Sequence, residues 1–247
     1  MKVNEIKKIL KKTKIKKGDT LMIHGDYGIT SQIDCKNKDK LKILFDEIIK
    51  YLGKDGTILI PTFTYSFCKN EYYDVKNTPS DIGLFSENFR KRKNVKRTCH
   101  PIFSFSIYGK KYKYFNKAKI DTCFGKDSIF DLFRKVKGKI ICLGTKFKFT
   151  FIHHIEEMFN VDYRFKKYFD GHIYYNGKKK YLKTEYFVLK KRYPNPNYRK
   201  IYDLFELKKI IHKTNFGRFE FVSIHSNFAY KYCQNLLKKD KYFFINK

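Results

Sequence analysis

Three short apolar runs limit what this chain can fold into. They are Thr20–His24, Thr57–Pro61 and Lys139–Gly144, and each ends at or just before a glycine or a proline. Runs of this length suit strands that are buried on both faces, because a helix needs a longer segment. A helix is instead predicted between the first two runs, over the amphipathic residues 39–52, which Gly53 closes. The pattern predicts an α/β fold with a central, mostly parallel or mixed sheet flanked by helices.

Weaker patterns place the remaining elements. Asn176-Gly177 lies inside the alternating stretch 165–189 and predicts a hairpin, so a smaller antiparallel region is expected in the C-terminal third. The polar residues 71–81 are expected to form a loop. Ser226 is expected to cap the closing helix. Further helices are predicted at 3–13, 82–92, 129–136, 202–212 and 226–237, and further strands at 102–109 and 219–224.

Length and cysteine usage set broad limits on the protein. The chain has 247 residues without a repeat or a Pro-rich or Ser/Gly-rich linker, so we expect a single domain over residues 1–247. Its six cysteines show no CxxC spacing, which argues against a zinc site or a redox pair, and we expect no metal. The N-terminus lacks an apolar signal region and no run is long enough to span a bilayer. We therefore expect a cytoplasmic protein without a membrane partner.

The charge of the chain is strongly positive. It holds 55 lysines and arginines against 24 aspartates and glutamates, a formal net charge of +31. Such a charge attracts polyanions, so a nucleic-acid-binding protein is the alternative from another functional class. We give it less weight because the lysines are spread along the whole chain and no recognisable binding motif is present. No specific nucleic acid is expected as a partner, and a polycationic ligand would need a locally acidic pocket.

The segment that follows the third apolar run carries the clearest chemical pattern. His153 and Glu156 lie three residues apart in a stretch of helical character, so their side chains share one helical face. A carboxylate that holds one imidazole nitrogen leaves the other nitrogen to take a proton from a substrate, which is a general-base pair. His154 and Glu157 repeat the spacing one residue later, so this second register stays open.

Polar groups also gather near the ends of other predicted strands. The turn Gly25–Gly28 has glycines that free backbone N–H groups at the carboxyl end of a strand, which suits a phosphate cradle or, equally, an ordinary strand-to-helix turn. Thr62 adds a hydroxyl after the second run. Arg97 and His100 stand at the entrance of the strand 102–109, where Arg97 suits a phosphate and His100 can donate to a carbonyl or a phosphate. A basic surface turn is the alternative there.

These motifs, in this order and at this spacing, resemble the aminoglycoside 3-N-acetyltransferase family. The resemblance implies an acetyl-CoA-dependent N-acetyltransferase built on a mixed α/β sheet. His153 and Glu156 match the catalytic pair of the family, and Thr150 also fits its pattern, which favours this register over the next one. The resemblance covers nearly the whole chain and rests on the segments Ile23–Gly28, Gly56–Thr62, Arg97–Ser104, Phe124–Ser128, and Leu143-Gly144 followed by Thr150–Glu156.

The same resemblance implies where acetyl-CoA binds. The loop after His24 and the stretch from Arg97 to Ser104 match segments that line the coenzyme site of the family. The family usually has His-Ser-Ser where this chain has His24-Gly25-Asp26, so a hydroxyl contact is missing and Asp26 would repel a phosphate. We therefore expect Asp26 to face the acceptor. The residues expected at the coenzyme site are His24, Gly25, Asp26, Tyr27, Thr62, Arg97, His100 and Ser104.

The expected reaction is direct transfer of acetyl to an amine. His153 would act as base, Glu156 would orient it, and Thr62 or backbone N–H groups would stabilise the oxyanion. A route through an acylated Cys99 beside His100 is less favoured, since adjacent residues of an extended segment point to opposite sides. The expected acceptor is an amino sugar, either of the aminoglycoside type or linked to a nucleotide, and the latter suits a basic protein. A monomer or homodimer is expected, and a family member that binds coenzyme without turnover is a further alternative.

Overall fold

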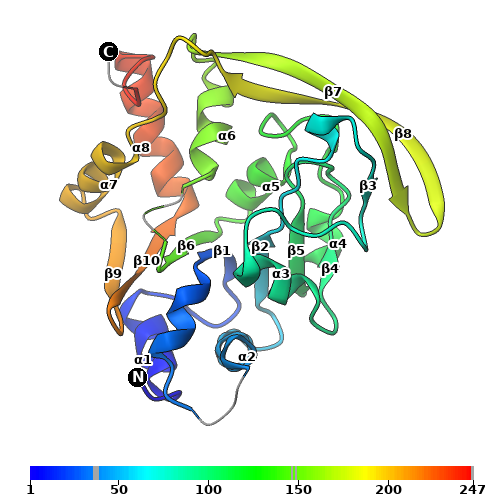
Figure 1. Cartoon of the computed structure of the whole chain (residues 1–247). Coiled ribbons are helices and arrows are strands. Elements are labelled where there is room, and N and C mark those ends of the chain that lie inside the picture. Colours follow the sequence, from blue (N-terminus) through cyan, green and yellow to red (C-terminus); the bar gives the residue numbers. More distant parts are fainter. Residues whose placement is uncertain (36–38, 146, 148, 246–247) are drawn as a thin grey trace.

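A computed structural model of the chain contains a seven-stranded mixed sheet (Figure 1). The structure describes residues 1–35, 39–145, 147 and 149–245. The strand order is β4-β5-β2-β1-β6-β10-β9, in which β1 pairs in parallel with β2 and β6 while the outer pairs are antiparallel. The three apolar runs form the centre of the sheet, as predicted. The strands are β1 Thr20–Gly25, β2 Thr57–Pro61, β4 Lys96–Arg97, β5 Phe105–Gly109, β6 Lys139–Leu143, β9 Ile211–Phe216 and β10 Phe219–His225.

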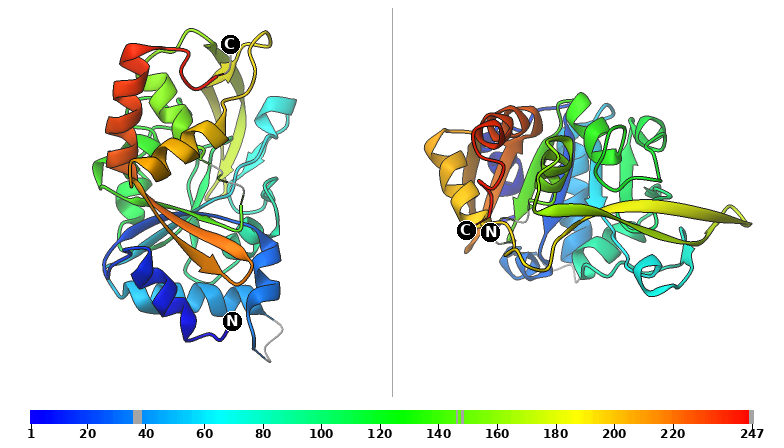
Figure 2. Two further views of the ribbon diagram at one scale, coloured as in Figure 1. Left: turned by 90° about the vertical axis from the view of Figure 1, so that its left-hand side faces the viewer. Right: turned by 90° about the horizontal axis from the view of Figure 1, so that it is seen from above.

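Helices cover both faces of this sheet (Figure 2). Successive residues of a strand point to opposite faces, and in β1 Leu21 and Ile23 pack in one buried cluster whereas Met22 packs in the other. This burial on both faces is why the runs read as continuously apolar. On the face of Leu21 lie α1 Glu5–Lys12, α2 Lys40–Leu52 and α3 Leu84–Arg90; on the face of Met22 lie α4 Tyr112–Phe115, α5 Ile129–Lys135, α6 Phe151–Met158, α7 Tyr198–Leu207 and α8 Ser226–Lys239.

A long hairpin forms a second, smaller sheet. Its strands are β7 Arg164–Tyr175 and β8 Lys178–Leu189, and they curve over the right-hand side of the molecule in Figure 1. Asn176 and Gly177 join them with φ of 50° and 73°, the left-handed conformation that this turn requires. The predicted hairpin is confirmed. The predicted loop 71–81 is wrong in part, because β3 Tyr73–Asp74 pairs in parallel with β7.

Two boundaries near the C-terminus differ from the prediction. The helix expected at 202–212 is α7, which begins at Tyr198 and ends at Leu207. Lys209 has φ of 55°, which ends the helix, and Ile211 starts an edge strand that pairs with β10. Ser226 is the first residue of α8 rather than its cap, and it is buried. Both errors come from strand pairing, which local patterns do not reveal.

The fold brings the ends of several elements to one edge of the sheet. The parallel strands β1 and β2 both run toward this edge, where two short 3₁₀ helices, η1 Tyr27–Gln32 and η2 Phe67–Lys69, lie in the connections. After β6 the chain reaches the same edge and enters α6, and the hairpin follows. Ligands of α/β sheets bind at such carboxyl edges. Within the described residues, no helix has the length and apolar character needed to cross a bilayer.

Candidate active site

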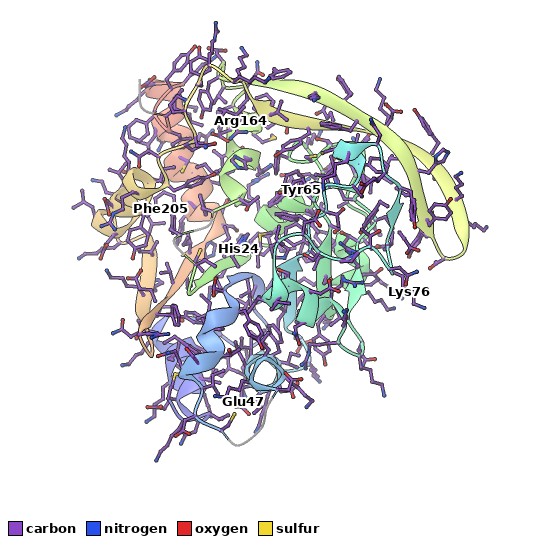
Figure 3. The ribbon with its side chains drawn as sticks, in the orientation of Figure 1. His24, Glu47, Tyr65, Lys76, Arg164 and Phe205 are labelled. Carbon is purple, nitrogen blue, oxygen red and sulfur yellow. The ribbon has the colours of Figure 1, made fainter. Side chains whose placement is uncertain are left out.

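A cavity of about 210 Å³ opens at the carboxyl edge of the sheet. Elements distant in sequence meet around it, because β1, β2, α3, α6 and β8 each contribute at least one side chain. Figure 3 shows His24 and Tyr65 of this cavity in the middle of the molecule, with Arg164 above them. The lining residues are His24, Gly25, Pro61, Phe63, Tyr65, Ile82, Ser86, Phe103, Thr145, Thr150, His153 and Tyr186.

The structure pairs His153 with Glu156 at the wall of this cavity. Nδ1 of His153 lies 2.7 Å from Oε2 of Glu156, as three-residue spacing on α6 allows. The glutamate side chain is fully buried, whereas the imidazole keeps 16% of its surface exposed. An ionised carboxylate only accepts hydrogen bonds, so the short distance favours a proton on Nδ1. Nε2 then carries the lone pair that a general base needs.

Two further side chains hold the buried carboxylate. The hydroxyl of Tyr163 donates to Oε1 of Glu156 at 2.8 Å. Nε of Arg164, the first residue of β7, forms an ion pair with Oε2 at 2.8 Å. A terminal nitrogen of Arg164 also lies 3.0 Å from Nδ1 of His153. The predicted pair is therefore part of a four-residue cluster, His153, Glu156, Tyr163 and Arg164, which we call the base cluster.

The environment of His153 favours the neutral imidazole. Burial lowers the pKa of His153 below its ordinary value of 6.5, the Arg164 charge lowers it further, and Glu156 opposes both effects. The hydroxyl of Tyr198, at the start of α7, lies 3.4 Å from Nε2. Burial raises the pKa of Tyr198 to about 12, so this hydroxyl stays protonated near neutral pH. Nε2 thus lies beside a neutral hydroxyl, and the imidazole that carries it lines the cavity.

The alternative register points elsewhere. His154 is fully buried, and its Nδ1 lies 2.6 Å from the carbonyl oxygen of Phe124, to which it donates. Burial lowers the pKa of His154 to about 4. Glu157 faces another surface hollow beside Glu185, and burial together with that neighbour raises the pKa of Glu157 to about 8. Of the two registers, the one with His153 and Glu156 meets the cavity.

The turn after β1 is shaped differently from a phosphate cradle. His24 and Gly25 line the cavity, and a Cβ atom on Gly25 would lie 2.3 Å from the ring of Phe85. Glycine is required here because that ring occupies the space of a side chain. Asp26 accepts from the backbone N–H of Gly28 at 2.7 Å and caps η1, so its carboxylate occupies the donor that a phosphate would use. Asp26 and Tyr27 are exposed and do not line the cavity.

Thr62, Arg97 and Ser104 are joined to one another behind the cavity wall. Ser104 donates from Oγ to the carbonyl of Thr62 at 2.7 Å, and Nε of Arg97 donates to the same Oγ at 3.0 Å. Terminal nitrogens of Arg97 donate to the carbonyls of Thr62 and Thr78. The three side chains are buried and absent from the cavity lining. Arg97 instead borders a separate cavity of about 850 Å³ near the hairpin tip.

His100 and Cys99 also lie outside the cavity of His153. Nδ1 of His100 accepts from the backbone N–H groups of Ile102 at 3.1 Å and Phe103 at 3.0 Å, and Nε2 donates to the carbonyl of Thr122 at 3.2 Å. Burial lowers the pKa of His100 to about 4. Burial also raises the pKa of the Cys99 thiol, which disfavours a thiolate. Both residues border a hollow of only about 10 Å³.

Sequence reasoning missed three residues around His153. Tyr163, Arg164 and Tyr198 lie 10, 11 and 45 residues after it, beyond any helical spacing. One signal was available, because a buried glutamate needs donors and a countercharge from elsewhere in the chain. That rule predicts that Glu156 has an arginine or tyrosine partner, but it does not predict the position of that partner in the chain. In the described residues, no group of three or more His, Cys, Asp or Glu side chains is placed to hold a metal ion.

Comparisons with known proteins agree with this architecture. A family model described as aminoglycoside 3-N-acetyltransferase matches residues 22–238. The chain is similar to the apoenzyme of aminoglycoside acetyltransferase AAC(3)-IVa, with 20% identity, coverage of 100% of this chain and 92% of that one, and a TM-score of 0.81. It is also similar to AAC-IIIb in a binary with CoASH, with 16% identity, coverage of 97% of each chain and a TM-score of 0.85. The YokD protein from Bacillus subtilis shares 18% identity, with coverage of 96% of this chain and 93% of that one and a TM-score of 0.79. These likenesses show the shared fold. No match was found among curated proteins.

Proposed function

Because the chain belongs to the aminoglycoside 3-N-acetyltransferase family, we propose that it transfers acetyl from acetyl-CoA to an amino group of an amino sugar, with His153 as general base. One observation carries the proposal. The Nδ1 atom of His153 is held 2.7 Å from the buried Glu156, while the same imidazole lines the cavity at the sheet edge. A base in this arrangement is oriented by its carboxylate and reachable by a substrate.

The proposed reaction is a direct transfer within a ternary complex. An acceptor ammonium gives its proton to Nε2 of His153, and the resulting amine attacks the thioester carbonyl of acetyl-CoA. The C–N bond forms as the carbonyl becomes an oxyanion. The C–S bond then breaks, the CoA sulfur leaves with the electron pair, and His153 returns its proton to the departing thiolate. The nitrogen of the new amide gives up its second proton to the freed imidazole, which releases it to solvent. Thr62 is buried away from the cavity, so the oxyanion would be stabilised by hydroxyls of the lining, which are those of Tyr65, Ser86, Thr145, Thr150 and Tyr186.

Acetyl-CoA is the proposed acetyl donor. The similarity to AAC-IIIb, whose structure holds CoASH, supports this choice. Of the residues expected at the coenzyme site, we retain His24 and Gly25, because they line the cavity. The internal partners of Thr62, Arg97, His100 and Ser104 give these four a supporting role behind the wall in our proposal.

For the acceptor, we propose an amino sugar linked to a nucleotide in preference to a polycation. Among the described residues that line the cavity of His153, none is an aspartate or a glutamate. The acidic residues that could neutralise a polycation each contact another group of the protein. These residues are Asp74, Asp81, Glu156, Glu157, Asp162 and Asp170. The net charge of +31 favours an anionic carrier in the same way.

A thiol assay with a panel of acceptors tests this function. Release of free CoA would be followed with acetyl-CoA and each of three acceptors: a nucleotide-linked amino sugar, a free amino sugar, and an aminoglycoside such as sisomicin. We expect turnover that is highest for the first. Efficient turnover of the aminoglycoside alone would reject the proposed acceptor but not the transfer. Thermal stabilisation by CoA without turnover of any amine would mark a degenerate family member.

The same assay separates direct transfer from a cysteine route. Cys99→Ala should keep its rate, because the thiol lies outside the cavity and burial raises its pKa. Near-complete loss of turnover in folded Cys99→Ala protein would favour an acyl-thiol intermediate instead.

A further inference from the structure

A buried carboxylate beside a base poses an electrostatic problem. The charge of Glu156 attracts a proton to His153, so by itself it would hold the imidazole in its protonated form. A protonated imidazole cannot accept the proton of an acceptor ammonium. A base of this kind therefore needs a second charge that offsets the carboxylate without displacing it.

Arg164 supplies such a charge with well-defined geometry. Its side chain is only 5% exposed, and its Nε lies 2.8 Å from Oε2 of Glu156. One terminal nitrogen donates to the carbonyl of Phe187 in β8 at 3.2 Å, and the other lies 3.0 Å from Nδ1 of His153. The guanidinium is thus fixed between helix α6 and both strands of the hairpin. Arg164 belongs to strand β7, so the hairpin and not α6 brings this charge to Glu156.

We propose that Arg164 is a positioning residue for acetyl transfer: it holds Glu156 from the base of the hairpin and offsets its charge, so that His153 meets the acceptor as the neutral imidazole. This inference rests on the proposed function of His153 as the base. The hairpin thereby gains a role in the reaction, since it sets the protonation state of a residue on α6.

The other titratable groups around His153 leave this balance unchanged near neutral pH. From the segment before β7, Tyr163 faces Glu156, and burial raises the pKa of that tyrosine. From α7, Tyr198 faces Nε2 as a neutral hydroxyl. From α8, burial raises the pKa of the Cys233 thiol, which therefore stays uncharged.

The remaining groups belong to the cavity wall. Its other described titratable side chains are His24, Tyr65 and Tyr186, and burial raises the pKa of both tyrosines. In this part of the structure, the carboxylate of Glu156 and the guanidinium of Arg164 are therefore the charges in closest contact with His153.

The sign of the effect follows from the charges. Arg164→Met removes a positive charge next to the imidazole and leaves the negative charge of Glu156, so His153 should bind its proton more tightly. Its pKa should rise by roughly one unit or more, which is the usual effect of one nearby charge. The acid limb of kcat/KM against pH should move upward by the same amount. Lost packing alone would lower the rate without moving the limb.

Two measurements on three variants test the proposal. Histidine 15N chemical shifts would be followed against pH in the wild type, Arg164→Met, Arg164→Lys and Arg134→Met, and kcat/KM would be measured in parallel. Arg134 is the matched control. It pairs with Asp131 of α5 at 2.9 Å, on the side of α6 where His154 is fully buried, which we call the sealed side. Of the three variants, only Arg164→Met should raise the pKa of His153. Arg164→Lys keeps the charge, so it should titrate like the wild type and recover part of the rate.

The outcomes separate the two hypotheses. If the pKa of His153 in Arg164→Met equals that of the wild type, the proposed role of Arg164 is overturned, whatever happens to the rate. If Arg164→Met does not fold, a pKa of His153 that is higher in Arg164→Lys than in the wild type overturns it instead. If no variant or wild type shows turnover, the proposed function fails, while the 15N titration still decides whether Arg164 controls the protonation of His153.

Discussion

Two neighbouring histidines on α6 have similar partners and opposite environments. His153 lies beside the carboxylate of Glu156, which pairs with Arg164. His154 likewise lies near a carboxylate that pairs with an arginine, because its Nε2 is 3.8 Å from Asp131, the partner of Arg134. One helical step separates them, yet His153 borders the cavity and His154 is fully buried.

The difference between the two sides of α6 lies in access and in hydrogen bonding. His154 donates from Nδ1 to a backbone carbonyl, which anchors α6 to the segment before α5. His153 holds a carboxylate with Nδ1, and its imidazole lines the cavity. A histidine, a carboxylate and an arginine in contact are therefore insufficient for a base; one ring nitrogen must also meet a space that a substrate can enter.

The largest effect should come from removing the base itself. His153→Ala should lower kcat/KM by about 10²- to 10⁴-fold, because that is the usual contribution of a general base. His154→Ala should leave the folded fraction active within a few fold. Steady-state rates, normalised to the folded fraction from circular dichroism, make the comparison. Equal losses in the two variants would erase the distinction between the two sides of α6.

The second-largest difference should appear when the carboxylates on the two sides of α6, Glu156 and Asp131, are neutralised. Glu156→Gln keeps the shape of the side chain but removes the charge that supports the imidazolium, so kcat should fall by about 10²-fold. Asp131→Asn, the matched change on the sealed side, should cost stability and leave kcat near the wild-type value. Measuring kcat together with urea unfolding distinguishes the two, and an unchanged kcat in Glu156→Gln would count against its orienting role.

A stability effect should mark the sealed side. Burial lowers the pKa of His154 to about 4 from 6.5, so the unfolded chain binds a proton that the folded chain does not. Stability should therefore fall as the pH drops from 6.5 toward 4, by up to about 3 kcal/mol from this residue. His154→Gln should be less stable at neutral pH and should lose less on acidification. Urea unfolding at several pH values measures this, and an unchanged pH slope would contradict it.

The smallest effect should come from the hydroxyl at Nε2. The Tyr198 hydroxyl lies 3.4 Å from that atom, a weak contact that an acceptor must displace or share. Tyr198→Phe should change kcat/KM by only about two- to fivefold, the value of one modest hydrogen bond. A loss near that of His153→Ala would instead assign the tyrosine a direct part in proton transfer.

Features of the fold with a local cause could be predicted from sequence. The apolar runs gave β1, β2 and β6, and Asn176-Gly177 gave the hairpin turn, because burial on both faces and left-handed backbone leave traces in neighbouring residues. The edge strand β9 and the two-residue β3 could not be predicted. Both exist through pairing with β10 and β7, which lie elsewhere in the chain.

The site divides in the same way. The contact between His153 and Glu156 follows from helical spacing, so sequence alone located it. Arg164 reaches the pair through the hairpin, which no spacing encodes. Conversely, Arg97 and His100 resemble ligand-binding groups in sequence, but their partners are carbonyl and N–H groups inside the protein. A polar side chain near a strand end serves the interior as readily as a substrate.

The pKa that controls turnover tests the central claim most directly. The acid limb of kcat/KM should be measured with an acceptor whose amine stays protonated over the range, and the 15N titration of His153 should be recorded on the same protein. Our account predicts that the two give one value, below the ordinary 6.5. An acid limb that departs from the His153 titration, or that persists unchanged in His153→Ala, would contradict it.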